Sequence, residues 1–239
     1  MTAILILGSG PNVGAASAWS RAGFDQIVAI NNAWQVRPDW DYAIFPWDFP
    51  QARRPNVGAG QRLVTQEEFV PAQNEFGGFV YAGATMAFTA AYWALAAFRP
   101  KVIAMMGCDM HYPARGKTHF YGTGSPDPLR PDITLQSLEA KSARLRILAA
   151  QHGCAMVNLS GGPSRLVFPK VGLEGVAGST PAAFDKCETL KALGMERMLK
   201  YQVPSGRYWE ELERFDPAQL RRLDALWLQA DQPGLMQSA

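Results

Sequence analysis

The sequence predicts an α/β fold: a Rossmann-like, doubly wound and mostly parallel sheet with a helical appendage at its C-terminal end. Two observations predict it. Short continuous apolar runs, each ended by Gly, Asn or Pro, alternate with turns and helical segments over the first two thirds of the chain. From residue 180 onward, helix starts recur but no further run of strand type does. The chain has 239 residues, of which 48% are hydrophobic and 18% charged. This composition excludes a disordered or collagen-like chain.

The apolar runs are short and continuous, which is typical of strands buried on both faces of a parallel sheet. We expect strands over residues 3–7, 27–30, 42–45, 102–106 and 155–157, and a further short strand at Leu63-Val64. Between residues 47 and 74 the periodicity is weak, and Pro, Gly and Arg are frequent. We therefore expect irregular structure over most of that stretch.

Helices are predicted where apolar residues recur at helical spacing or where start signals are present. The expected helices cover residues 15–21, 83–98 and 134–151, and two more start at Thr180-Pro181 and Asp216-Pro217. His152 and Gly153 end the third of them. This division predicts a nucleotide-binding domain over residues 1–170 and a helical appendage over residues 171–239.

Charge and cysteine content limit the partners and the compartment. Lys and Arg number 23 and Asp and Glu 21, a balance too even to favour a nucleic-acid partner. The three cysteines, Cys108, Cys154 and Cys187, form no CxxC pair, which argues against a zinc ribbon or redox motif. Their odd number favours reduced thiols in the cytoplasm, and no basic segment typical of a secretory signal precedes the first apolar run.

One segment reaches the length of a transmembrane helix. Residues 76–98 contain no charged side chain, and 23 residues are enough to span a bilayer. Their glycines, threonines and alanines lower the mean hydropathy, which favours a helix buried in the α/β core. We expect no transmembrane segment, and a peripheral membrane contact stays open as the alternative.

Ligands of open parallel sheets bind outside the carboxyl ends of the strands, so the residues after each strand are the candidates. The turn after the first strand lacks a complete dinucleotide fingerprint, because Val13 stands where the third glycine is needed. The second strand ends in Asn31 rather than an acidic residue, and no P-loop is present. We predict binding of a nucleotide by another scheme, with a purely structural glycine turn as the alternative. The nucleotide-binding candidates are Gly8, Ser9, Gly10, Asn12, Asn31, Asn158 and Gly162.

The candidate catalytic residues follow the fourth of the long apolar runs. Asp109 stands at its carboxyl end, where a carboxylate can orient a ligand or cap a turn. His111 comes two residues later, and His119 lies in the polar segment 111–132, which we expect to be mobile and to close over the site. Since rigid placement favours catalysis, His111 ranks before His119. No metal-ligand spacing is found, so no metal site is predicted in this interpretation.

These strand ends together resemble those of the bacterial sialyltransferases of glycosyltransferase family 42 and the related 6-hydroxymethylpterin diphosphokinases. The resemblance is carried by residues 6–11 (ILGSGP), Asn31, the glycine before the long apolar helix and Gly107-Cys108-Asp109, and it spans residues 3–168. It implies a Rossmann-like core. It also implies that Gly8, Ser9, Gly10 and Asn31 surround the CMP part of a sugar donor, with residues 158–164 nearby.

Three functions follow from these observations. The first is a nucleotide-binding, glycosyltransferase-like enzyme that uses a CMP-type sugar donor and a sugar acceptor and holds no cofactor tightly. The second is a diphosphokinase-type enzyme acting on a pterin, with Mg²⁺ held by Asp109 and Asp48. The third is a non-catalytic nucleotide- or sugar-binding protein of the same fold, because residues 128–132 lack the histidine that the sialyltransferases carry before the late helix.

Overall fold

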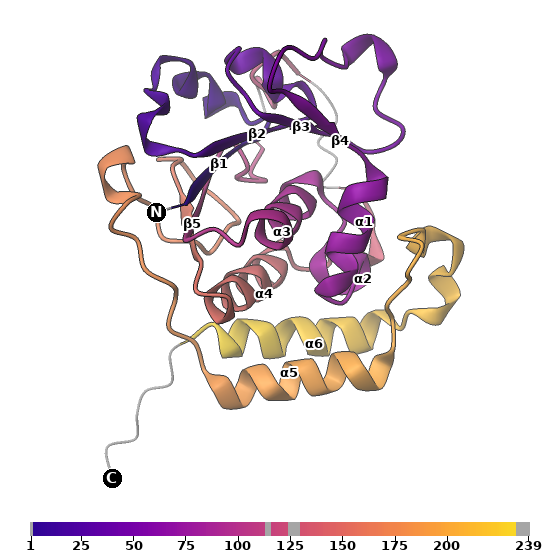
Figure 1. The fold of residues 1–239 in the computed structure, drawn as a ribbon. Coiled ribbons are helices and arrows are strands. Elements are labelled where there is room, and N and C mark those ends of the chain that lie inside the picture. The colour runs from indigo at the N-terminus through magenta and orange to yellow at the C-terminus, as the bar shows by residue number, and fades with distance from the viewer. Residues whose placement is uncertain (1, 113–115, 124–129, 233–239) are drawn as a thin grey trace.

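The computed structural model describes residues 2–112, 116–123 and 130–232 (Figure 1). Its centre is a six-stranded sheet in the order β4-β3-β2-β1-β5-β6, in which every neighbouring pair is parallel. The strands are β1 (Ala3–Leu7), β2 (Gln26–Ile30), β3 (Tyr42–Ile44), β4 (Arg62–Val64), β5 (Val102–Met106) and β6 (Ala155–Asn158). The predicted α/β fold, with a parallel sheet and helices at the C-terminal end, is confirmed.

The strand order reverses between β1 and β5. The chain adds β2, β3 and β4 on one side of β1 and then returns to place β5 on the other side, with Leu7 opposite Met106. The connections after β1 and after β5 therefore leave the sheet side by side. In sheets of this kind, that switch point is where ligands bind.

The two faces of the sheet are covered differently. Strand side chains alternate between them, so that Ile4 and Ile103 lie on one face and Leu5 and Ala104 on the other. Four α-helices cover the first face: α1 (Gln66–Glu75), α2 (Phe79–Ala82), α3 (Met86–Phe98) and α4 (Leu138–Gln151) (Figure 1). The short 3₁₀ segments Pro11–Ala18 and Asn31–Val36 pack on the second face, and so does Val176, which follows the 3₁₀ turn Leu173–Gly175.

Several predicted boundaries are wrong. The helix expected over residues 15–21 is a 3₁₀ helix over Pro11–Ala18, which anchors only Val13 and Ala16 in the core. The stretch expected to be irregular contains α1, because Phe69 and Ala72 pack inward and the two glutamates of its first turn suit a helix N-terminus. Residues 76–98 are broken at Gly77, Gly78 and Gly83, all with positive φ. In the described ranges no helix combines the length and the apolarity needed to cross a bilayer.

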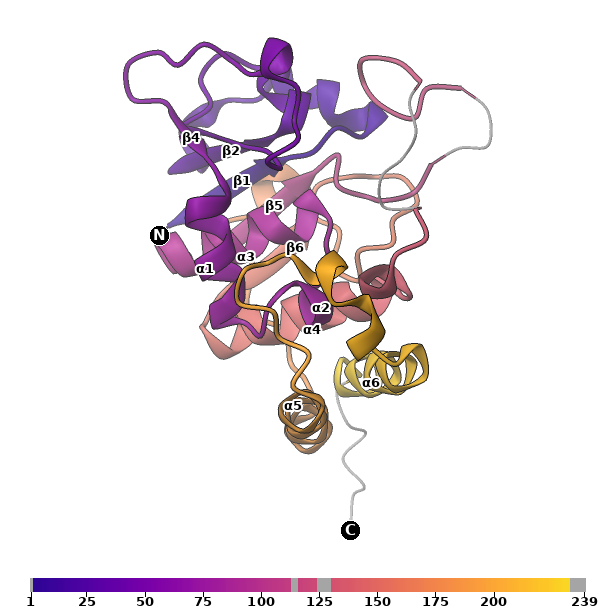
Figure 2. The same ribbon diagram turned by 90° about the vertical axis from the view of Figure 1, so that its right-hand side faces the viewer.

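Two antiparallel helices, α5 (Lys186–Leu199) and α6 (Pro217–Ala230), form an outer layer beyond α4 (Figures 1 and 2). Asp216 caps α6 as expected, since its carboxylate accepts the N–H of Ala218 at 2.7 Å. The start predicted at Thr180 is wrong, because Asp185 accepts N–H groups of the first turn and α5 begins after it. Leu220 and Trp227 belong to the same apolar cluster as the sheet, so the appendage shares the core of the sheet domain.

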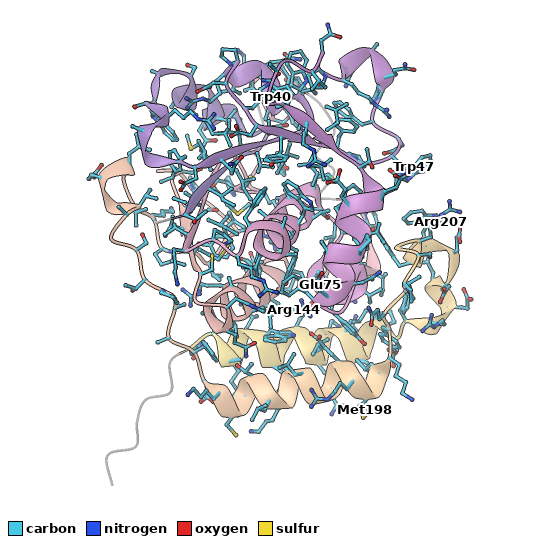
Figure 3. The ribbon with its side chains drawn as sticks, viewed as in Figure 1. Trp40, Trp47, Glu75, Arg144, Met198 and Arg207 are labelled. Carbon is cyan, nitrogen blue, oxygen red and sulfur yellow. The ribbon has the colours of Figure 1, made fainter. Side chains whose placement is uncertain are left out.

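Charged side chains of α4 are buried against this outer layer, which the sequence did not predict. Arg144 is 1% exposed and forms two hydrogen bonds with Glu196 of α5, at 2.7 and 2.9 Å. Lys141 Nζ lies 2.8 Å from Asp224 of α6 and is also 1% exposed. Figure 3 shows Arg144 between the sheet-side helices and the outer pair. The ion pairs therefore join the two predicted domains.

Candidate functional site

The turns after β1 and β5 contact each other through their backbones. The N–H of Gly8 donates to Met106 O, and the N–H of Gly10 donates to Gly107 O, both at 2.8 Å. A Cβ atom added at Gly10 would lie 2.8 Å from Gly107 O, closer than side chains approach backbone. Close packing between the two turns therefore requires these glycines, whether or not a ligand binds.

This contact changes the role expected for Gly8 and Gly10. Their N–H groups are already bonded within the protein, so neither is free to cradle a phosphate. A side chain at Gly10 would also displace the β5 turn, so its effect on ligand binding could not be separated from its effect on the fold. The side chains around the two turns are the better candidates.

Asp109 links the ends of three strands. Its carboxylate is almost fully buried and accepts the amide N–H of Asn12 at 3.0 Å on one oxygen and that of Asn158 at 2.9 Å on the other. Its backbone carbonyl accepts the N–H of Arg165 at 2.9 Å. These bonds connect the segments after β1, β5 and β6. Asp109 thus holds the side chains of Asn12 and Asn158 in place, and its predicted role toward a ligand stays a prediction.

Asn158 and Gly162 are brought to the same edge but offer little to a ligand. The Asn158 amide also donates to Ser164 Oγ at 3.1 Å, and its oxygen accepts the N–H of Ser160 at 2.9 Å, so both ends are used. Gly162 is exposed, and its carbonyl accepts a hydrogen bond from Lys170 Nζ at 2.7 Å. The geometry gives Asn158 a structural role.

Six side chains have buried polar atoms without a partner among the described residues. Gln73 and Asn74 belong to α1 and Asp224 to α6, and the other three follow β1 and β2. Ser9 Oγ, Asn12 Oδ1 and Asn31 Oδ1 are inaccessible to solvent and form no hydrogen bond with the described residues. The side-chain amide of Asn12 donates its N–H to Asp109, so the amide oxygen is the atom that has no hydrogen-bond partner. Asn31 adopts a left-handed backbone conformation (φ 53°) directly after β2. Each unpaired buried group costs about 1–3 kcal/mol, so their grouping at the ends of neighbouring strands indicates a ligand or bound water.

The structure anchors the segment around His119 and leaves His111 exposed, the opposite of the placement expected from the sequence. His111 is exposed and forms no hydrogen bond or ion pair with the described part of the chain. His119 begins a tight turn closed by two backbone bonds to Gly122, and the N–H of the next residue, Phe120, donates to Ser9 O at 3.1 Å. His119 is therefore held directly beside the turn that carries Ser9.

The His119 ring lies in an aromatic cluster with Tyr112 and Tyr121, at centroid distances of 6.1 and 5.1 Å. Its Nδ1 lies 2.9 Å from Thr118 Oγ1. Partial burial lowers the pKa of His119 below its usual value, because desolvation disfavours the charged imidazolium form. The closing loop expected over residues 111–132 falls in large part on residues 113–115 and 124–129, which lie outside the described residues.

Sequence reasoning missed a contribution from the C-terminal appendage. Tyr208, between α5 and α6, donates its O–H to Asp132 Oδ2 at 2.6 Å, and Arg130 Nη2 donates to Tyr208 Oη at 3.3 Å. Arg130 also donates to Ala84 O at 2.9 Å, just before α3. Burial raises the pKa of Tyr208 to about 12, so the phenol stays protonated. No spacing in the sequence links a tyrosine at position 208 to this loop.

A cavity, the arrangement of possible metal ligands and a buried thiol indicate no further binding or catalytic site in the described part of the chain. A cavity of about 590 Å³ lies beside the C-terminal end of α4, but the Arg144 and Glu196 side chains at its wall are already paired. Among residues 2–112, 116–123 and 130–232, no three His, Cys, Asp or Glu side chains gather as metal ligands. The thiol of Cys108, beside Asp109, is buried, which raises its pKa far above the usual range and leaves it inert.

The fold and the strand-end geometry define an α/β protein with a candidate ligand site at its switch point. In comparisons with family models, curated proteins and solved structures, nothing matches the chain. The function therefore has to be argued from the residues of the site.

Proposed function

We propose that the carboxyl edge of the sheet binds a nucleotide, and that the protein is a glycosyltransferase-like enzyme that uses a CMP-type sugar donor. The observation that supports this most directly is the set of three unpartnered buried atoms, Ser9 Oγ, Asn12 Oδ1 and Asn31 Oδ1, at the ends of β1 and β2. Ser9 and Asn12 follow β1 at the switch point, where parallel sheets bind ligands, and Asn31 follows the neighbouring strand β2.

The chemistry of these atoms favours a nucleoside over a bare phosphate. The two asparagine oxygens only accept hydrogen bonds, so they need a ligand that supplies O–H or N–H donors. Ribose hydroxyls and the exocyclic amine of a cytosine or adenine base supply several such donors, whereas an inorganic phosphate dianion has a single O–H and a phosphate monoester dianion has none. The donor nucleoside would therefore lie across the ends of β1 and β2.

Sugar transfer also requires a group that accepts a proton. The acceptor's hydroxyl oxygen forms the new bond to the anomeric carbon, and the bond from that carbon to the phosphate oxygen breaks with its electron pair leaving on the nucleotide. The hydroxyl proton must be taken up, and a neutral imidazole can take it. In this proposal His119 is the base, because it is held beside Ser9 and its pKa is lowered.

Calorimetric titration with CMP, and with ATP in the presence and absence of Mg²⁺, tests the binding proposal. We expect CMP to bind without metal, and Asn31→Gly to weaken binding by about fivefold, the value of one lost hydrogen bond. Glycine accepts φ 53° without strain, so the substitution removes the acceptor and leaves the backbone in place. Binding of ATP that depends on Mg²⁺, with none of CMP, would instead support the diphosphokinase function.

The pH dependence of turnover tests the catalytic role of His119. Because a general base works only when deprotonated, kcat/KM should fall as the pH drops through the His119 pKa, which burial places below the usual histidine value, and should be flat above it. His119→Asn should lower kcat by about 100-fold or more and remove this acid limb. His111→Asn is the matched control and should change kcat less than about twofold, because that side chain is exposed and unbound. An unchanged acid limb in His119→Asn would exclude His119 as the base.

A further inference from the structure

The outer face of α5 combines exposed apolar and basic side chains. Leu190 is 65% exposed and Met198 is 68% exposed, the two highest values among the large apolar residues of the described chain. Figure 3 shows Met198 on the side of α5 that faces away from α6 and from the sheet. This face contributes nothing to the core.

The helical positions of these residues form one continuous stripe. At about 100° per residue, Leu190, Gly194 and Met198 lie within about 80° of each other. Arg197 and Lys186 flank the stripe on one side, and Lys191 flanks it on the other. All three cations are exposed, and Lys200 directly after the helix is exposed as well. We call this surface, made of Lys186, Leu190, Lys191, Gly194, Arg197, Met198 and Lys200, the outer face of α5.

The acidic residues of α5 are turned inward. Glu196 is 7% exposed and paired with Arg144, and the Glu188 side chain is 14% exposed and paired with Lys191. Among the described residues, Lys186, Arg197 and Lys200 have no acidic partner within ion-pair distance. The helix therefore presents net positive charge around an apolar centre, although the whole chain carries a formal charge of only +2.

We infer that the outer face of α5 is a contact surface for an anionic lipid membrane. Basic side chains around a narrow apolar stripe are the pattern of helices that lie in the bilayer interface, where the apolar residues enter the acyl boundary and the cations meet lipid phosphates. The same charge distribution disfavours a second copy of α5 on this face, because the cations of two such helices would meet. The inference is independent of the nucleotide site, which lies at the carboxyl edge of the sheet.

Co-sedimentation with vesicles tests this inference. The full chain should bind vesicles of phosphatidylcholine with about a third phosphatidylglycerol, bind pure phosphatidylcholine vesicles far more weakly, and lose binding at high salt. Arg197→Glu should reduce partitioning by about 20-fold, since it removes one favourable charge and adds an unfavourable one. Met198→Glu should reduce it by about 10-fold or more.

Matched substitutions elsewhere serve as controls. Leu173→Glu places the same charge at an exposed apolar residue between Val171 and Val176, which pack on the other face of the sheet from α1 to α4, and Lys101→Glu reverses an exposed cation directly before β5. Both should leave vesicle binding within about twofold. Equal binding to neutral and anionic vesicles, or no binding at low salt, would overturn the inference. So would a dimer in light scattering that Met198→Glu converts to a monomer, because the face would then belong to a second copy.

Discussion

Two regions of this protein bury polar groups, and they differ in whether those groups are hydrogen-bonded within the protein. Between α4 and the outer helices, Arg144 binds Glu196 through two hydrogen bonds and also donates to Tyr92 Oη at 2.8 Å, while Trp227 donates to Glu196 at 2.9 Å. At the carboxyl edge of the sheet, Ser9 Oγ, Asn12 Oδ1 and Asn31 Oδ1 have no partner in the described chain.

The difference in hydrogen bonding helps to distinguish residues that stabilise the fold from residues that are candidates for ligand binding. A buried polar network that is fully satisfied within the protein needs nothing from outside, and it serves to hold layers together. A group of buried acceptors that lack donors is costly to the folded state unless water or a ligand completes it. The paired cluster around Arg144 and Glu196 is therefore structural, although Asp224 Oδ2 in the same interface has no partner among the described residues, and the neutral strand ends are where we propose that the ligand binds.

The largest effect we expect comes from breaking the satisfied network. Glu196→Leu leaves the guanidinium of Arg144, which is 1% exposed, buried without its counter-charge. Loss of one partner of a buried pair destabilises proteins by about 3–5 kcal/mol, and denaturant unfolding monitored by tryptophan fluorescence measures it.

The double variant Arg144→Leu with Glu196→Leu sharpens this result. Because it removes both charges, it should recover much of the lost stability. If the double variant is less stable than Glu196→Leu alone, then the pair is not what joins the layers. Nucleotide affinity should stay unchanged in whichever of these variants folds.

A smaller effect distinguishes the two regions directly. Ser9→Ala removes a hydroxyl that has no partner, so the free energy of unfolding should stay the same or rise by up to about 1 kcal/mol, while CMP affinity falls about fivefold. Calorimetric titration and denaturant unfolding measure the two changes in the same variant.

Ser142→Ala is the matched control within the structural region. Ser142 is fully buried, and its Oγ accepts the N–H of Val167 at 2.9 Å, so the same substitution should cost about 1 kcal/mol of stability and leave CMP affinity unchanged. If Ser9→Ala instead lowers stability and spares affinity, Ser9 belongs with the structural residues.

The sheet could be predicted from the sequence because its strands are apolar on both faces. The runs at residues 3–7 and 102–106 match β1 and β5 residue for residue. Helix α1 was missed because it is short and contains Pro71, and its packing against α3 adds a tertiary stabilisation that local pattern does not reveal. The start of α5 was misplaced because Thr180-Pro181 and Asp185 carry similar start signals, and tertiary contacts decide between them.

The position of the candidate site could be predicted from the sequence, but the hydrogen bonding of its side chains could not. Strand ends can be located from the sequence, so Asp109, Asn12 and Asn31 were found. Which of their atoms remain unpaired depends on long-range bonds such as that from Asn12 to Asp109, 97 residues apart, which local pattern cannot reveal. The anchoring of the segment around His119 likewise depends on the backbone bond between Phe120 and Ser9, which are 111 positions apart in the sequence.

The buried ion pairs of α4 also bear on how the chain folds during synthesis. Helix α4 ends at Gln151, but the carboxylates that neutralise Arg144 and Lys141 belong to Glu196 and Asp224. At about 5–20 residues per second, roughly 4–15 s separate the synthesis of α4 from that of its last partner. Throughout that interval the nascent sheet domain carries two cations on the surface that will later be covered. These charges keep that surface hydrated and oppose its aggregation, and only the arrival of α5 and α6 turns it into core.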